Sequence, residues 1–259
     1  MTWQNAASLC VDLNSDMGEG FGAYRMGDDE AILNIVSSAN IACGLHAGDP
    51  EIMAKTFALA RERGVAVGAH PGFPDLWGFG RRVIPFSTGE IERLVAYQIG
   101  AAQALSAYAG HPITYVKAHG ALGNLTQTDA DVSAAIARAI KAVDPRLVCL
   151  TFANGHLERI GKEMGLRVCA EVFADRAYTD EGQLVHRKVP GAVLHDAHEA
   201  AARMLRMVRA GAIETVSGKL VPAPLESICV HSDTPGAISM AAEVRRTLED
   251  AGVTVRSFS

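Results

Sequence analysis

Residues 38–70 read SANIACGLHAGDPEIMAKTFALARERGVAVGAH. The stretch opens with a short apolar run, continues through a longer segment of mixed apolar and charged residues, and closes with a second apolar run. Asp49 and Pro50 are typical of the start of a helix, and Gly64 is typical of its end. A strand, a helix and a strand in this order predict two parallel strands joined by a right-handed crossover.

The same alternation of short apolar runs and helical segments continues along the chain. Strands are predicted at Cys10–Asp16, Ser38–Gly44, Val65–His70, Ile113–His119, Leu147–Ala153, Arg167–Phe173 and Ser227–Asp233, with a weaker one at Val253–Phe258. Helices are predicted at Ile91–Ala109 after a capping box that begins at Ser87, at residues 129–143 with Thr128 as the cap, and at His195–Ala210.

Seven or eight parallel strands in a chain of 259 residues predict an α/β protein. We expect one domain over residues 1–259, a TIM-like (β/α) barrel, with an open doubly wound sheet as the alternative. The segments 73–86, 176–193 and 212–225 are longer than ordinary connections, and the last is predicted to form a hairpin around Ser217 and Gly218. Long loops at one end of a barrel are where an active site is usually built.

Composition excludes several classes of function. The net charge is −5 and no Lys or Arg run forms a basic stripe, which argues against a nucleic acid or an anionic membrane as partner. No apolar stretch approaches the ~18 residues of a membrane helix. The five cysteines have no CxxC spacing and lie in or beside apolar runs, so we expect reduced core thiols and a cytoplasmic protein.

Side chains alternate between the two faces of a strand, and this sorts each predicted strand into two sets. One set is mostly apolar and is expected under the helices. The other set is polar toward the carboxyl end of the strand, and comprises Asp12, Asn14, Asp16, His46, His70, Lys117, His119, Glu171, Asp175, His231 and Asp233. Inward charges must be paired or functional, so their recurrence on several strands predicts an active site at the carboxyl end of the barrel.

The roles of these residues stay open at this level. Asp16, His46, His70 and His119 are candidate ligands of a divalent metal, but no HxH or HExxH spacing selects a ligand set, and a metal-free acid–base network is the alternative. Lys117 is either a Schiff-base or general-base lysine or a counter-ion to Asp12 or Asp16. Arg81 and Arg82 are suited to clamping a carboxylate or phosphate, or form a surface ion pair. The Gly-rich turn DMGEGFG at 16–22 matches neither a P-loop nor GxGxxG.

Long segments of the chain resemble one known family. They are VDLNSDMGEGFGAYRMGDDE (11–30), SANIACGLHAGDP (38–50), VGAHPGFPDLWGFGRR (67–82), YVKAHGALGN (115–124), EVFADRAY (171–178) and CVHSDTPGA (229–237). Together they identify the chain as similar to the LamB/YcsF family. The resemblance implies a barrel related to the glycoside hydrolase/deacetylase barrels. It also implies cleavage of the cyclic amide of 5-oxo-L-proline (pyroglutamate) to L-glutamate, coupled to ATP hydrolysis, in a complex with two further subunits, B and C.

The resemblance also carries site residues. The catalytic candidates are Asp12, Asn14, Asp16, His46, His70, Lys117 and His119, and the substrate-binding candidates are Glu19, Asp49, Arg81, Arg82, Glu171, Asp175, Arg176, His231 and Asp233. Our hypothesis is that His70 or His119, oriented by Asp16 or Asp12, deprotonates water, while Lys117 stabilises the oxyanion. The alternatives are a stand-alone metal-dependent deacetylase or amidohydrolase and a non-catalytic lactam-binding subunit.

Overall fold

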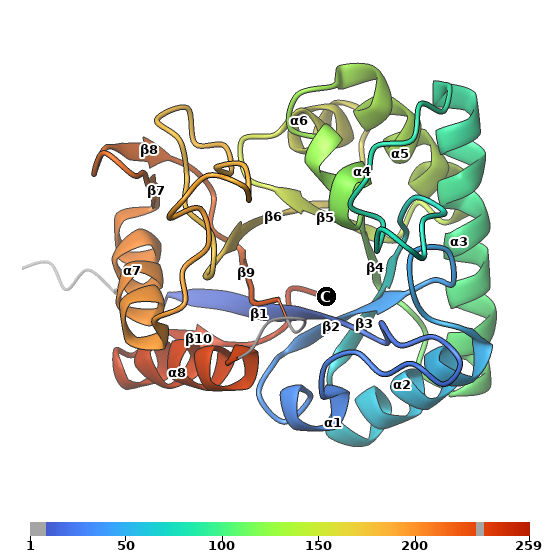
Figure 1. Cartoon of the computed structure of the whole chain (residues 1–259), viewed down its shortest axis with the longest axis horizontal. Helices are drawn as coiled ribbons and strands as arrows, with labels where there is room; N and C mark the ends of the chain where they lie inside the picture. Colours follow the sequence, from blue (N-terminus) through green and yellow to red (C-terminus); the bar gives the residue numbers. More distant parts are fainter. Residues whose placement is uncertain (1–8, 232–235) are drawn as a thin grey trace, which may run out of the picture.

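A closed barrel of parallel strands is the centre of the molecule (Figure 1). The computed structural model describes residues 9–231 and 236–259, and within them seven strands form the barrel. These are β1 (Cys10–Met17), β2 (Ser38–Ala42), β3 (Ala66–His70), β4 (Tyr115–Lys117), β5 (Val148–Phe152), β6 (Val168–Phe173) and β9 (Ser227–Cys229). The strand β9 pairs with both β6 and β1, so the sheet closes. The predicted barrel is therefore confirmed, and the alternative, an open doubly wound sheet, is wrong.

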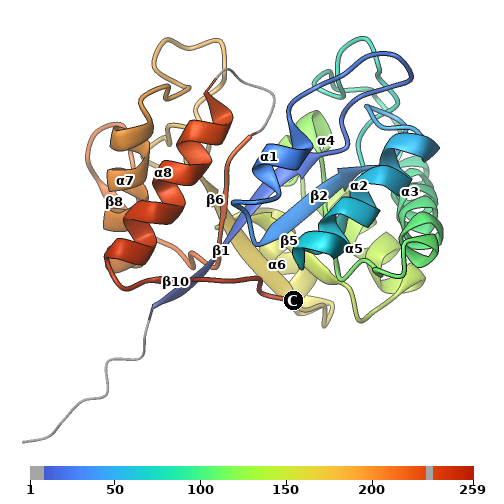
Figure 2. The ribbon, with the colours of Figure 1, turned by 90° about the horizontal axis from the view of Figure 1, so that it is seen from below.

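The weaker eighth strand has a different place. It is β10 (Thr254–Val255), and it pairs only with the first two residues of β1, Cys10 and Val11. Figure 2 shows this pair and the C-terminus at one end of the barrel, while the loops that follow β1, β3 and β6 lie at the opposite end. The barrel is thus closed by β9, and β10 extends it at the amino end of β1.

Helices surround the barrel (Figures 1 and 2). They are α1 (Asp29–Ile32), α2 (Pro50–Arg63), α3 (Thr88–Tyr108), α4 (Gly120–Leu125), α5 (Ala130–Val143), α6 (His156–Glu163), α7 (Ala197–Ala210) and α8 (Ala237–Asp250). Between α7 and β9, the strands β7 (Ala212–Glu214) and β8 (Leu220–Pro222) pair antiparallel, which confirms the predicted hairpin.

The helix boundaries follow from local capping. Gly64 ends α2 in the left-handed conformation with φ 65°, and Ser87 forms the predicted capping box with Glu90 at the start of α3. The prediction for α5 is wrong by one residue, because Asp129 rather than Thr128 accepts the hydrogen bonds of the first turn. A carboxylate accepts such bonds more strongly than a hydroxyl does and also favours the positive end of the helix dipole.

The two faces of the strands differ as the alternation predicts. Outward side chains such as Leu13, Val67 and Ile228 are fully buried against the helices. Inside the barrel, Tyr115 packs against Phe258 and closes the amino end. The ring of Tyr115 lies so close to Gly68 that a Cβ there would be 2.3 Å from it, so only glycine fits at this position.

The cysteines are free, as expected, but not all are in the core. Cys43, Cys149, Cys169 and Cys229 are buried, whereas Cys10 is exposed because it begins β1 at the edge of the barrel. Within residues 9–231 and 236–259, no helix is both long enough and apolar enough to span a bilayer.

Candidate active site

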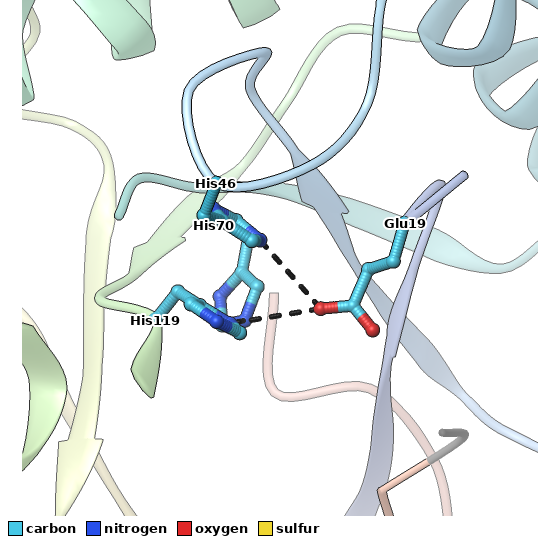
Figure 3. A group of neighbouring side chains, drawn as sticks. All are labelled: Glu19, His46, His70 and His119. Atoms are coloured by element: carbon cyan, nitrogen blue, oxygen red, sulfur yellow. Dashed lines mark hydrogen bonds and ion pairs between the residues drawn. The ribbon is translucent and has the colours of Figure 1, made fainter. Parts of the chain in front are cut away.

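Three histidines and one glutamate meet at the carboxyl end of the barrel (Figure 3). Glu19 follows β1, His46 follows β2, His70 ends β3 and His119 follows β4. One potential ligand atom from each lies within 4.8 Å of all the others, and all four side chains are buried. Neighbouring parallel strands thus bring together residues that are far apart in the chain.

Hydrogen bonds to backbone carbonyls determine which ring nitrogens of two histidines carry protons. Nδ1 of His70 lies 2.8 Å from the carbonyl oxygen of Lys117, and Nε2 of His119 lies 2.8 Å from that of Phe79. A carbonyl oxygen only accepts, so these nitrogens are the donors. The remaining nitrogens, Nε2 of His70 and Nδ1 of His119, lie 3.0 Å apart. When both rings are neutral, two lone pairs therefore face each other, and a shared proton or a cation is needed to stabilise them.

His46 completes this cluster. Its ring stacks on His119 with centroids 3.6 Å apart, and within the described part of the chain neither of its nitrogens has a hydrogen-bond partner. Oε1 of Glu19 lies 3.6 Å from both Nε2 of His46 and Nδ1 of His119. A buried, unpartnered imidazole is costly unless a ligand satisfies it. These distances are too long for hydrogen bonds, and they leave space between the carboxylate oxygen and the two ring nitrogens.

Two imidazoles of the cluster, those of His46 and His119, are held in the neutral form. Burial, and then the neighbouring His119 and His70, place the pKa of His46 well below its usual value. Burial and His70 lower the pKa of His119 to about 3. A neutral imidazole is the form that ligates a metal, and three imidazoles with one carboxylate are a donor set suited to zinc and similar ions. The residues therefore fit a divalent transition metal.

The loop 71–87 between β3 and α3 encloses the cluster. A Cβ at Gly72 would lie 2.6 Å from Nδ1 of His46, and one at Gly80 would lie 2.8 Å from the ring of His119. The backbone reaches the rings only because these residues are glycines. Arg82 donates to the carboxylate of Asp75 and thus holds this loop in shape, so it does not face the site.

Asp16 is held beside the cluster by a buried polar network. Its Oδ1 accepts from Nδ2 of Asn40 at 2.8 Å and from Nζ of Lys117 at 3.2 Å, while its Oδ2 lies 3.4 Å from Nε2 of His70. Burial raises the pKa of Asp16, but His70 and Lys117 outweigh burial and bring it well below its usual value. Asp16 is therefore an ionised carboxylate with one oxygen directed toward the histidines.

Lys117 is the counter-ion of this network. Its ammonium lies 3.0 Å from Oε2 of Glu171, 3.0 Å from Sγ of Cys229 and 3.1 Å from Oδ1 of Asn14, in addition to Asp16. Burial lowers the pKa of Lys117, but the nearby anions outweigh burial and raise it well above its usual value. An ammonium has three N–H donors, and these acceptors occupy them. The geometry therefore favours Lys117 as a counter-ion of these carboxylates, not as a general base.

A second acid–base pair faces the same cavity. Nδ1 of His231 lies 2.8 Å from Oδ2 of Asp175, and Nη2 of Arg187 lies 3.2 Å from Nε2 of His231. Burial raises the pKa of Asp175, but His231 outweighs it, so the net shift is downward and this carboxyl is ionised. The carboxylate sets the orientation of the imidazole, whose Nε2 lies beside the cavity and accepts from Nη2 of Arg187. This arrangement is that of a histidine positioned to exchange a proton.

The two histidine groups open into one cavity of about 370 Å³. Among its lining residues are Asp16, His70, His119, His231, Arg81 and Arg176. Arg176 is buried and donates to the backbone carbonyls of Val185 and Ala192, so it also shapes the loop 176–193. The two long loops predicted from the sequence therefore border the site.

Other predicted site residues lie elsewhere. Asp12 accepts from the hydroxyls of Ser37, Ser38 and Ser227, about 13 Å from Asp16 at ~3.3 Å per strand residue. It therefore cannot orient His70 or His119. Asp49 caps α2 and also accepts from the N–H of Gly22, so it is occupied structurally.

Glu171 and Asn14 support Lys117 beneath the cavity and do not line it. Asp233 lies outside the described residues. Arg187 and Lys188 line the cavity but were not predicted. Their signal in the sequence is the basic pair in the long loop 176–193, which lies outside the strand ends.

Comparisons with known proteins agree with this fold. The LamB/YcsF family profile matches residues 11–259. The chain is 61% identical over 249 residues to a protein of Gluconobacter oxydans that is named as the A subunit of 5-oxoprolinase, covering 96% of this chain and 98% of that protein. It is 59% identical, with the same coverage, to the protein of that name from Azorhizobium caulinodans.

Solved structures extend the comparison. The crystal structure of the lactam utilization protein from Thermus thermophilus superposes with a TM-score of 0.92 at 46% identity, covering 96% of this chain and 100% of that one. The T48 deacetylase superposes with a TM-score of 0.51 at 16% identity, covering 96% of this chain and 88% of that one, a similarity of fold alone. The chain belongs to the LamB/YcsF family.

Proposed function

We propose that this chain is the A subunit of an ATP-dependent 5-oxoprolinase, a hydrolase that cleaves 5-oxo-L-proline to L-glutamate as ATP is hydrolysed to ADP and phosphate. The observation that carries the proposal is the 61% identity, over nearly the full length, to a protein that bears this name. The site supports it, because a cavity of about 370 Å³ accommodates a small lactam between two groups of acid–base residues.

Opening a lactam requires a proton acceptor for water and a proton donor for the departing nitrogen. Asp16 directs Oδ2 toward the cluster, whereas the available nitrogens of His70 and His119 face each other. This geometry favours Asp16 as the proton acceptor for water, whereas the sequence suggests His70 or His119. His231, held by Asp175, is placed on the cavity to protonate the nitrogen.

We infer that Glu19, His46, His70 and His119 hold a divalent metal. When bound, such an ion supplies a Lewis acid that polarises a carbonyl and lowers the pKa of water. Glu19 replaces Asp16 in the ligand set that we predicted, because Oδ1 of Asp16 is already engaged by Asn40 and Lys117. The facing lone pairs of His70 and His119 support this assignment.

The relatives are named as one component of a larger enzyme, which supports a complex. We propose 5-oxoprolinase subunits B and C as the partners and ATP as the co-substrate. The free cysteines support a cytoplasmic location.

The test is to combine the purified chain with subunits B and C, supply 5-oxoproline with and without ATP, and measure glutamate. We expect glutamate only when all three subunits and ATP are present. Turnover by this chain alone without nucleotide, abolished by a chelator, would instead support the metal-dependent amidohydrolase that the histidine cluster also suits. Full activity of a complex containing Asp16→Asn would support a lactam-binding role without catalysis.

A further inference from the structure

His231 is held between two charged side chains at the mouth of the cavity. Its Nδ1 lies 2.8 Å from Oδ2 of Asp175, and its Nε2 lies 3.2 Å from Nη2 of Arg187. A guanidinium only donates, so Nε2 of His231 accepts from Arg187, and Nδ1 carries the proton that is donated to Asp175. In this state Arg187 occupies the ring nitrogen that we expect to face the lactam.

The charge of Arg187 is balanced across the imidazole ring. Burial raises the pKa of Asp175, but His231, and after it Arg187, outweigh burial and bring it below its usual value. Asp175 contacts one ring nitrogen of His231 and Arg187 contacts the other, so the two ions interact through the ring between them. A guanidinium has five N–H donors. Among the described residues, the hydrogen bond of Arg187 is the one to His231, and its side chain lines the cavity, so other donors are available to a ligand.

The spacing of these two side chains matches the substrate. 5-Oxoproline carries its carboxylate on the ring carbon next to the lactam nitrogen, and standard bond lengths place a carboxylate oxygen about 3 Å from that nitrogen. Nη2 of Arg187 and Nε2 of His231 are 3.2 Å apart. One of them therefore reaches the carboxylate while the other faces the nitrogen of the same molecule.

The rest of the cavity suits the same orientation of the lactam ring. A carboxylate oxygen of Asp16 and a ring nitrogen of His231 lie within 4.8 Å of each other, a separation that allows them to act on the two atoms of one amide bond. Phe173 stacks on His231 with ring centroids 5.2 Å apart, and Phe152 stacks on Phe173 at 5.1 Å. Both phenylalanines line the cavity and offer an apolar wall to the methylene groups of the substrate.

We propose that Arg187 recognises the carboxylate of the substrate. When 5-oxoproline enters, the guanidinium moves its hydrogen bond from Nε2 of His231 to the carboxylate and leaves that nitrogen facing the lactam. The exchange is favourable because a carboxylate accepts more strongly than a neutral imidazole and binds a guanidinium through two parallel hydrogen bonds. The site thus selects lactams with a carboxylate beside the N–H over neutral lactams of the same ring size. This inference rests on the proposed function.

Two arginines that the sequence suggests for substrate binding are engaged by the protein itself. Arg82 is paired with Asp75, and Arg176 donates to backbone carbonyls of its own loop. Arg187, by contrast, contacts the histidine that we assign to the lactam nitrogen.

The test is titration calorimetry of the purified chain with 5-oxoproline and with 2-pyrrolidone, which is the same ring without the carboxylate. We expect the wild type to bind 5-oxoproline at least about tenfold more tightly. Arg187→Gln should lose most of this preference while its affinity for 2-pyrrolidone stays within about threefold. Arg187→Lys, which keeps the charge without the planar fork, should retain part of the preference. The control is Arg159→Gln, which removes a cation paired with Glu163 on the outer helix α6 and should behave as the wild type.

Thermal melting of each variant establishes that it is folded. A preference that Arg187→Gln retains overturns the proposal, and so does equal weakening of both lactams, which would mark a residue that only shapes the loop. Absence of 5-oxoproline binding by the wild type also overturns it. Glutamate formation by the complex is measured in parallel. Glutamate together with an unchanged preference in Arg187→Gln rejects only this inference, whereas carboxylate-dependent binding without glutamate rejects the proposed function.

Discussion

Nε2 of His70 and Nδ1 of His119 lie 3.0 Å apart, and each ring uses its other nitrogen to donate to a backbone carbonyl. Neutral rings in this arrangement direct two lone pairs at each other. Oε1 of Glu19 borders the same space, as does the ring of His46, whose nitrogens have no hydrogen-bond partner among the described residues. The arrangement is therefore organised around a positive charge, and a divalent cation is the ion that this donor set best accommodates.

The first prediction concerns this metal. Purified protein should contain about one equivalent of zinc or a similar ion, measured by elemental analysis, and should bind cobalt with the absorption spectrum of imidazole ligation. Glu19→Gln and His46→Ala should each lower the affinity by at least about tenfold. His198→Ala is the control, because this histidine is paired with Glu243 on the surface. Equal metal content in all of these proteins would refute the assignment.

The second prediction concerns Asp16. The substitution Asp16→Asn keeps the size of the side chain but removes its charge and its ability to accept a proton. We expect kcat for glutamate release by the three-subunit complex to fall by roughly 10²–10⁴. Asp144→Asn, which alters a surface pair with Arg146, should leave kcat unchanged. A kcat near that of the wild type for Asp16→Asn would remove Asp16 from the reaction.

The third prediction concerns the dyad of Asp175 and His231. His231→Gln should lower kcat by roughly 10² or more, because it removes the proton donor to the lactam nitrogen. It should leave the metal content intact, since His231 lies outside the cluster of Glu19 and the three histidines. Combined kinetics and elemental analysis separate the two roles. Loss of the metal together with activity would show that His231 acts on the cluster.

The fourth prediction concerns pH and Asp12. Burial raises the pKa of Asp12 from 3.8 to about 6, although three serine hydroxyls partly oppose the shift. The folded state therefore holds a proton that the unfolded state releases between about pH 4 and 6, so this residue makes the free energy of unfolding fall as pH rises through that window.

Asp12→Asn removes this dependence. Between pH 4 and 7 its stability should improve relative to that of the wild type by up to ~3 kcal/mol, from about 1.4 kcal/mol per pKa unit. Denaturant unfolding of both proteins at several pH values measures the difference. Parallel pH profiles would exclude Asp12 as the group responsible.

The fifth prediction concerns Lys117. Lys117→Met leaves Asp16 and Glu171 buried without their counter-ion and should cost about 3–5 kcal/mol of unfolding free energy. The double variant Lys117→Met/Glu171→Gln removes one of those charges and should recover part of the loss. Denaturant unfolding of the single and double variants forms the test, and an additive or larger loss in the double variant would contradict the pairing.

The sequence by itself determined the parallel α/β class, the main helix boundaries and the inward face of the strands, and it favoured a barrel over an open sheet. These depend on local patterns: the alternation of side chains along a strand, and capping residues such as Asp49, Ser87 and Gly64. The same alternation placed Asp16, His70, Lys117 and His119 on one side of the sheet before their contacts were known. Such patterns predict which side chains point into the barrel, because the backbone of each strand sets the direction of its side chains.

Only the tertiary structure decided what each inward residue does. Asp12 and Asp16 share a face of one strand, but serines surround Asp12, whereas Asn40, Lys117 and His70 surround Asp16. Neighbouring strands supply different partners at each level. The structure also brought Glu19 to the histidines and Arg187 to the mouth, both from loops. Contacts between residues far apart in the chain depend on how strands and loops close around one cavity. No local sequence pattern predicts these contacts.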